Sequence, residues 1–342
     1  MTDIATVRAL LPITLSARDG ISLTLTPLGA RMTGLWAPDR AGTLADIVLG
    51  HDRAEDYLTP DGYIGATCGR YGNRIAGGSF VLDGVTVTLD RNEGPNQLHG
   101  GSQGFDLRIW QVAAQEADCV TFALTSPDGD MGFPGEVKAT CTYQLVGAYG
   151  LLIAMTATTS APTVVNLVNH SYFNLAGQGE GDVLGHDLTI HADHYTPVDT
   201  ANIPTGEIRA VAGTAFDFRT PRPIGAAMPG DAGFDHNFCL SGHLASTRSG
   251  LLRRAADLRD PASGRSLQVL TTEPGLQLYT GAHFDGSQRG KGGASYGKFA
   301  GVALETQVFP DSPNRPQFPS ARLNPGQVYE HLMYLDLTPS SD

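Results

Sequence analysis

The stretch Phe80-Val81-Leu82-Asp83-Gly84-Val85-Thr86-Val87 decides the fold class. Asp-Gly stands between two alternating runs of residues. A type I′ turn requires positive φ angles at both central positions, and Asp-Gly is a preferred pair there, so the stretch predicts a β-hairpin. Other period-two segments rich in Val, Thr, Leu and aromatic residues recur along the chain. We predict strands at residues 22–26, 79–82, 85–89, 120–124, 151–159, 164–168, 267–272, 302–307 and 328–337.

These strands predict an all-β architecture. A short helical piece is expected at 53–58, and no helices alternate with the strands as a βαβ sheet would need. The 42 Gly and 21 Pro among 342 residues suit a chain with many turns. No Ser/Gly linker, charge run or low-complexity tract marks a boundary. We therefore predict that residues 1–342 form one domain, a single large antiparallel β-sandwich.

Composition excludes several classes of partner. With 23 basic and 35 acidic residues the net charge is −12, which disfavours nucleic acid and anionic membrane surfaces. No apolar run reaches the ~18 residues of a membrane span. The N-terminal stretch 1–12 lacks the apolar region of an export signal, so a cytoplasmic location is expected. Cys68, Cys119, Cys141 and Cys239 are widely scattered, which predicts buried free thiols rather than disulfides or a zinc knuckle.

Four segments combine polar or ionisable residues with apolar or glycine-rich surroundings, as a sugar-sized site requires. They are 69–78 together with 92–101, 164–175, 233–238 and 301–311. By contrast, the pairs in 128–130 and 191–194 offer two metal ligands each and lack a third at a usual spacing. No metal site is expected.

Parity places Glu305 on one face of its predicted strand. Val302 and Leu304 share the other face, because side chains alternate with period two. Taken alone, the pattern fits the solvent face of an edge strand, and His170 taken alone fits a hydrogen-bonded structural histidine.

The combination of motifs changes this interpretation, because the sequence resembles the aldose 1-epimerase (galactose mutarotase) family over about residues 60–337. Five motifs occur in the order of that family: Gly72-Asn73-Arg74-Ile75, Asn96-Gln97-Leu98-His99-Gly100-Gly101, Asn169-His170-Ser171-Tyr172-Phe173-Asn174-Leu175, Phe234-Asp235-His236-Asn237 and Leu304-Glu305-Thr306-Gln307. The resemblance implies a galactose mutarotase-like supersandwich and an isomerase of hexose metabolism. Such an enzyme interconverts the α and β anomers of free aldoses by ring opening, rotation about C1–C2 and reclosure.

The resemblance also implies roles for individual residues. Glu305 would be the general base that takes the proton of the C1 hydroxyl, and His170 the general acid that protonates the ring oxygen. At ordinary pKa values of ~4.3 and ~6.5, the carboxylate is ionised and the imidazole partly protonated at neutral pH. No metal or organic cofactor is expected, and the partner is a monosaccharide of the glucose, galactose, xylose or arabinose class bound by a monomer or homodimer. The residues expected to hold sugar hydroxyls are Asn73, Arg74, His99, Asp235 and Gln277.

Several alternatives stay open at this point. Arg74 and Asp235 could form a structural ion pair, and Gln277 could be an outward-facing strand residue. Two other functions are a sugar-phosphate epimerase, for which Arg70 and Arg74 are the close basic pair near the site motifs, and a noncatalytic carbohydrate-binding protein. The apolar face of a sugar could contact aromatic rings that could equally belong to the core: Phe173, Phe284 and Phe309.

Overall fold

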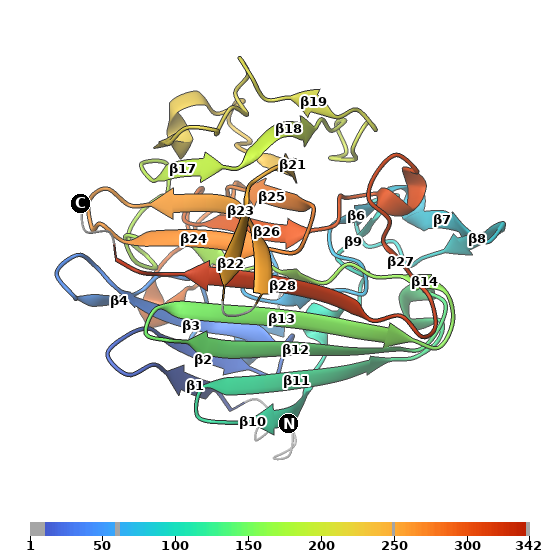
Figure 1. The fold of residues 1–342 in the computed structure, drawn as a ribbon, viewed down its shortest axis with the longest axis horizontal. Coiled ribbons are helices and arrows are strands. Elements are labelled where there is room, and N and C mark those ends of the chain that lie inside the picture. The colour runs from blue at the N-terminus through green and yellow to red at the C-terminus, as the bar shows by residue number, and fades with distance from the viewer. Residues whose placement is uncertain (1–10, 59–61, 248–249, 340–342) are drawn as a thin grey trace.

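The computed structural model describes residues 11–58, 62–247 and 250–339, which form strands and short 3-10 helices (Figure 1). Residues 1–10, on which most of the expectation about an export signal rests, lie outside the described residues. No described helix has the length and apolar character that a membrane crossing needs. The short helices are η1 (Ala54–Leu58), η2 (Ala76–Gly78), η3 (Phe105–Leu107), η4 (Asp130–Gly132), η5 (Ile224–Ala227), η6 (Lys291–Gly293) and η7 (Ser312–Asn314).

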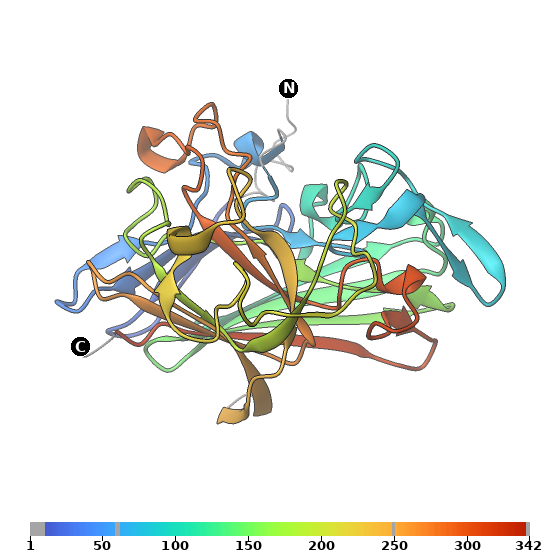
Figure 2. The ribbon, with the colours of Figure 1, turned by 90° about the horizontal axis from the view of Figure 1, so that it is seen from above.

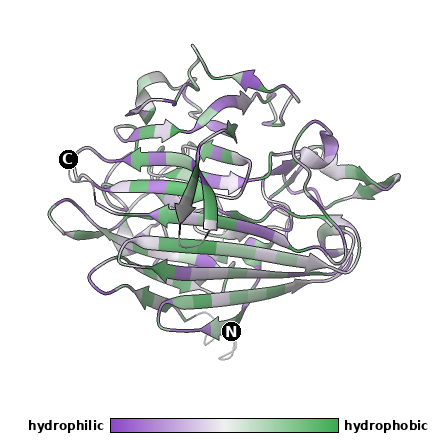
Figure 3. Cartoon of the chain, viewed as in Figure 1, coloured by the Kyte–Doolittle hydropathy of each residue, from purple (hydrophilic) through white to green (hydrophobic). Residues whose placement is uncertain are grey.

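The largest sheet is antiparallel and, in Figure 1, runs from β10 at the bottom through β28 to β17 at the top. Figure 3 shows apolar residues distributed along its long strands. Its order is β10 (Gln111–Gln115), β11 (Cys119–Ser126), β12 (Val137–Val146), β13 (Gly150–Thr159), β28 (Tyr329–Asp336), β24 (Ser266–Thr271), β23 (Gly250–Arg259), β17 (Asp187–Ile190) and β20 (Arg222–Pro223), with β22 (Leu244–Thr247) beside β23.

A second, six-stranded sheet carries much of the functional site. Its order is β16 (Tyr172–Phe173), β26 (Val302–Gln307), β25 (Gly275–Tyr279), β21 (Asp235–Leu240), β18 (Ala192–Thr196) and β19 (Arg209–Ala210). A four-stranded sheet contains β1 (Ile13–Ser16), β2 (Ser22–Thr26), β3 (Arg31–Pro38) and β4 (Leu44–Asp46). The short pairs are β14 (Thr163–Val164) with β27 (Arg322–Leu323), β15 (Val168–Asn169) with β5 (Thr67–Cys68), β6 (Arg74–Ile75) with β9 (Gln97–Leu98), and β7 (Ser79–Leu82) with β8 (Val85–Thr88).

The predicted hairpin is confirmed. Leu82 pairs with Val85, and the two turn residues between them, Asp83 and Gly84, have φ angles of 51° and 80°. Both values are positive, as a type I′ turn requires. The hairpin projects from the body of the molecule in the two perpendicular views of Figures 1 and 2.

One predicted strand is wrong. Residues 164–168 do not form a single strand, because β14 and β15 pair with different partners. Asn166, between them, explains the break. Its side-chain amide donates to the carbonyl of Gly72 at 2.9 Å, and its side-chain oxygen accepts from the backbone N–H of Val308 at 3.0 Å. The chain therefore crosses between sheets here instead of continuing along one of them.

The three large sheets share one hydrophobic core. Its main cluster includes Leu23 of β2, Tyr143 of β12 and Leu304 of β26, and extends from Leu15 to Leu337. The all-β sandwich is confirmed by this arrangement, while the description of residues 1–342 as one domain stays a prediction.

The four cysteines are free, as expected, but Cys119 and Cys239 are only partly buried, which corrects the expectation of burial for all four.

Glu273, between β24 and β25, is a buried carboxyl group away from the site motifs. The hydroxyl of Tyr329 donates to its Oε1 at 3.3 Å, and Nδ1 of His331 lies 3.8 Å from the same oxygen. Burial raises the pKa of Glu273 to about 7 and lowers that of His331 to about 4, so the two do not form an ion pair at neutral pH.

We expect Glu273→Gln to stabilise the protein at alkaline pH. The pKa of Glu273 is raised from 4.5 to about 7 on folding, so its contribution to stability is fully present below pH 4.5 and is lost as pH rises through 7. Gln keeps the acceptor for Tyr329 and removes the charge. The variant should exceed the wild type by up to about 3 kcal/mol in urea unfolding near pH 8 and match it near pH 4. An equal difference at both pH values, or the same effect from Glu136→Gln, whose side chain is half-exposed, would contradict this account.

Candidate active site

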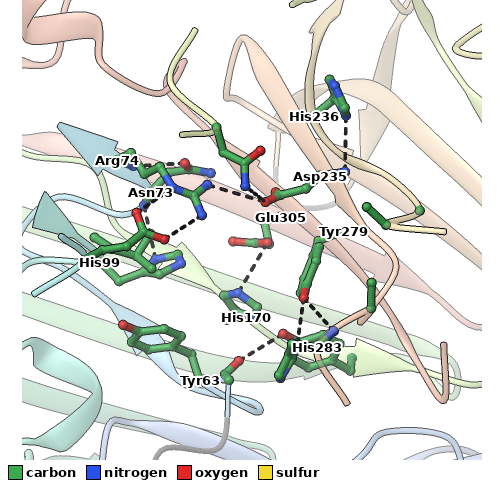
Figure 4. Close-up of a pocket in the computed structure, with 18 of the residues that line it drawn as sticks. Tyr63, Asn73, Arg74, His99, His170, Asp235, His236, Tyr279, His283 and Glu305 are labelled. Atoms are coloured by element: carbon green, nitrogen blue, oxygen red, sulfur yellow. Dashed lines mark hydrogen bonds and ion pairs between the residues drawn. The ribbon is translucent and has the colours of Figure 1, made fainter. Parts of the chain in front are cut away.

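A cavity of about 540 Å³ opens where the six-stranded sheet meets the loops that precede β6 and follow β9. Figure 4 shows its polar side chains pointing toward one another from separate elements. All of the predicted site residues except Gln277 line it, namely Asn73, Arg74, His99, His170, Asp235 and Glu305.

Glu305 lies on β26, which is a central strand. It lies between β16 and β25, and Val302 and Leu304 on its other face pack into the main core. Glu305 is 2% exposed and lines the cavity, so the solvent-facing interpretation is wrong. The alternation of side chains along β26 is as predicted. The loops around the cavity cover the polar face of this strand, which keeps Glu305 away from bulk solvent.

His170 follows β15 and approaches Glu305. Its backbone N–H donates to the carbonyl of Ala66 at 2.8 Å, and its own carbonyl accepts from Gly65 at 2.9 Å, so the main chain is fixed on both sides. The ring is in contact with those of His99 and Tyr172, at centroid distances of 5.1 and 5.0 Å. Nε2 lies 3.5 Å from Oε1 of Glu305. An imidazole and a carboxylate therefore face one another inside the cavity.

The surroundings of Glu305 make its ionisation costly. Burial raises the pKa of Glu305 well above its ordinary value; the negative charge of Asp235 raises it further, and Arg74 opposes both. Oε2 has no hydrogen-bond partner within the described part of the chain. The expectation of an ordinary pKa for this carboxyl is corrected, and the ionised group is a stronger proton acceptor than an exposed glutamate.

The raised pKa predicts the acid limb of the pH–rate profile. A protonated Glu305 cannot accept a proton, so kcat/KM should fall on the acid side with a midpoint above the ~4.3 of an ordinary glutamate. Polarimetry on a fresh single anomer, corrected for the uncatalysed rate at each pH, measures this midpoint. A profile that stays flat down to about pH 3 would contradict a glutamate base.

His99 is held as a neutral hydrogen-bond donor. The backbone N–H of Asn73 donates to its Nδ1 at 3.1 Å, which places the proton of the neutral ring on Nε2. Burial lowers the pKa of His99 well below its ordinary value, and the neighbouring His170 and Arg74 lower it further. Asn73 and His99 have left-handed φ angles of 64° and 51°, a conformation that Asn tolerates. The structure thus presents an Nε2–H group to the cavity.

Arg74 joins two carboxylates on the cavity wall. Its Nε and Nη2 donate to Glu93 at 2.7 and 2.8 Å, and Nη1 lies 3.4 Å from Oδ2 of Asp235. Gln277 is buried behind this pair and donates to Oδ1 of Asp235 at 2.6 Å. Gln277 is thus not outward-facing, and it contacts Asp235 instead of lining the cavity. The ion pair of Arg74 and Asp235 exists, and both partners also face the cavity.

The aromatic walls differ from those expected. Phe173, Phe284 and Phe309 are buried and are not among the described lining residues, which corrects the idea that they contact a sugar. Tyr63, Tyr172 and Tyr279 line the cavity instead. Figure 4 shows Tyr63 and Tyr279 beside the catalytic candidates. Strand parity could have found one of them, because Tyr279 follows Gln277 by two residues within β25.

Arg70 and Arg74 do not act as a basic pair. The guanidinium of Arg70 is buried elsewhere and donates to the carbonyls of Pro134 and Gly135 at 3.0 and 2.8 Å.

Glu93 lines the cavity, although the sequence did not indicate that it would. It belongs to segment 92–101, one of the four predicted site segments, but nothing in that segment shows that its partner is Arg74.

Asp128 and His191, each from one of the two pairs considered as metal ligands, make other contacts in the structure. Asp128 accepts from the backbone of Gly135 at 2.5 Å, and His191 contacts Asp257 at 2.6 Å. Within the cavity, ligand atoms of His99, His170 and Glu305 lie within 4.8 Å of one another, close enough to be considered for a cation. The expectation that no metal is needed stays a prediction.

Comparisons with known proteins agree on one family. The family model described as Aldose 1-epimerase matches residues 12–335. The chain is 46% identical over 318 residues to galactose mutarotase of Bos taurus, which covers 92% of this chain and 91% of that protein. It is 40% identical over 328 residues to aldose 1-epimerase of Escherichia coli (strain K12), covering 94% and 93%. An aldose epimerase homologue from C. elegans has a TM-score of 0.89 at 31% identity, covering 97% of this chain and 99% of that structure.

Proposed function

Since the chain belongs to the aldose 1-epimerase family, we propose that Glu305 and His170 are the base and acid with which it interconverts the anomers of a free aldose. The enzyme is an isomerase. The observation that carries the assignment is the approach of His170 Nε2 to Glu305 Oε1 at 3.5 Å inside a cavity lined by hydrogen-bonding groups. Binding alone does not need an acid and a base on one substrate, which argues against a noncatalytic sugar-binding protein.

The reaction balances without a co-reactant. Ionised Glu305 takes the proton of the C1 hydroxyl while protonated His170 gives its proton to the ring oxygen, and the C1–O5 bond breaks with its electron pair going to oxygen. C1 becomes an aldehyde carbon, and rotation about C1–C2 presents its other face. On reclosure, His170 takes the proton of the C5 hydroxyl as the oxygen attacks C1, and Glu305 returns its proton to the former carbonyl oxygen. Both residues end as they began.

The other lining groups suit the hydroxyls of a neutral sugar. His99 offers an Nε2–H donor, and Asn73, Arg74 and Asp235 offer further donors and acceptors around the same cavity. Arg74 is already paired with carboxylates, and Arg70 donates to carbonyl groups away from the cavity. These pairings favour a free aldose of the glucose, galactose, xylose or arabinose class over a sugar phosphate. The cytoplasmic location and the monomeric or homodimeric state stay predictions.

Polarimetry tests this function directly. Freshly dissolved α-galactose and α-glucose should approach anomeric equilibrium with a rate constant that rises in proportion to enzyme concentration. Galactose 6-phosphate and glucose 6-phosphate should be accelerated much less. Sugar binding without acceleration would favour a carbohydrate-binding protein, and faster turnover of the phosphates would favour a sugar-phosphate epimerase; either result would overturn the proposal.

A further inference from the structure

We propose that Glu93 is a specificity-determining residue that restricts this site to uncharged aldoses. It does so by occupying the guanidinium of Arg74 and by adding a negative charge to the cavity wall. This inference rests on the proposed function, because it concerns which sugars the same site accepts.

The first argument is the saturation of Arg74. A guanidinium beside a ligand cavity is the group best suited to hold a carboxylate or phosphate through two parallel hydrogen bonds. Here Glu93 already makes both bonds, to Nε and Nη2 at 2.7 and 2.8 Å. The remaining nitrogen, Nη1, faces Asp235 at 3.4 Å, and Figure 4 shows Arg74 pointing toward that residue. An anionic sugar would have to displace a carboxylate to gain Arg74.

The second argument is the accessibility of the pair. The Arg74 side chain is 10% exposed, whereas that of Glu93 is 35% exposed. The carboxylate is therefore the more accessible partner, and an approaching anion meets repulsion where a bare arginine would attract it. Both residues appear in the lining of the cavity, so the effect acts on the bound sugar as well as on its entry.

The third argument is that the backbone fixes Glu93 in this position. Glu93 and Asn96 exchange backbone hydrogen bonds at 3.2 and 3.0 Å in the turn that leads into β9. The side chain of Asn92 closes the same turn by bonding both backbone groups of Leu98, at 2.9 and 2.8 Å. Leu98 in turn pairs with Arg74 across the β6–β9 ladder. The two charged partners thus stand side by side, Arg74 on β6 and Glu93 in the turn before β9.

The charge balance of the cavity gives Glu93 its effect. Besides four histidines, of which His170 carries a proton in the proposed mechanism, the described lining contains one arginine, Arg74, and one lysine, the exposed Lys298. It also contains four carboxyl groups, which belong to Glu93, Asp231, Asp235 and Glu305. Replacing Glu93 with neutral Gln removes one negative charge and one of the two acceptors that hold the Arg74 guanidinium. Both changes favour an anion, and together they should alter discrimination by about tenfold or more.

Glu93→Gln tests the proposal with substrates that differ in charge. We compare kcat/KM for galactose with that for galacturonate, which has a carboxylate in place of the C6 hydroxymethyl group. The wild type should strongly prefer galactose, and the galacturonate-to-galactose ratio should rise about tenfold or more in Glu93→Gln. The acid limb of the galactose profile should also move to lower pH, because the freed positive charge of Arg74 favours ionisation of Glu305.

Control variants separate specificity from structure. Glu93→Asp keeps the charge and should retain the wild-type ratio, whereas the exposed Glu116→Gln makes the same charge change away from the cavity and should have no effect. A merely structural role would lower both activities together and leave the ratio unchanged, which would overturn the proposal. If turnover is too slow to follow, calorimetric titration gives the dissociation constants of galacturonate and galactose, whose ratio should shift in the same direction. Galactose turnover by the wild type is measured first, so failure of the proposed function is recognised separately.

Discussion

Glu305→Gln should lower kcat for galactose mutarotation by about 10²- to 10⁴-fold, the contribution typical of a positioned general base. This corresponds to roughly 3 to 5 kcal/mol of transition-state stabilisation. Gln has the shape of the carboxyl group but cannot accept the C1 proton. Polarimetry on fresh α-galactose measures the loss, and a rate within tenfold of the wild type would rule out Glu305 as the base.

Thermal unfolding provides the control for this variant. Burial raises the pKa of Glu305 in the folded protein, so the carboxyl contributes stability at low pH that is lost as pH rises through its folded-state pKa. A neutral Gln avoids the cost of burying a charge. Glu305→Gln should therefore keep or raise the wild-type Tm at neutral pH, and a lowered Tm would attribute lost activity to misfolding instead of to missing chemistry.

His170→Asn should cause a loss of similar size, about 10²- to 10⁴-fold in kcat, because Asn has no proton to give to the ring oxygen at neutral pH. The pH–rate profile of the variant should also lack the part that titration of the imidazole contributes to the wild-type profile. His170→Gln serves as a comparison, since its amide N–H can approach the position of Nε2 as a donor but is not an acid. If either variant retains activity within tenfold of the wild type, ring opening does not depend on proton transfer from His170.

The elements that local sequence specifies were the ones predicted from it. The turn at Asp83 and Gly84 needs only the φ preferences of its own residues, and the alternation of β26 needs only its own side chains. The segment 164–168 differs because Asn166 bonds to Gly72 and Val308, which are distant in sequence. Propensity within five residues does not reveal such partners.

The candidate site was predictable in its residues and less so in its environment. Parity placed Glu305 on the polar face, but its burial depends on neighbouring strands and loops that meet only in the folded chain. The same limit explains why Arg70 was considered as a phosphate ligand although carbonyl groups hold it elsewhere. It also explains why Glu93 was passed over, since its importance comes from Arg74 lying opposite.

The hydrogen bond from the Asn73 backbone to His99 has a consequence for chelation by transition metals. Two imidazoles and a carboxylate are a known ligand set for zinc and iron, and the ligand atoms of His99, His170 and Glu305 lie within 4.8 Å of one another. A metal ion bound at Nε2 of His99 would force that proton onto Nδ1, directly against the N–H of Asn73. Binding of a metal ion at Nε2 would therefore break this hydrogen bond, so one backbone amide opposes chelation at this position.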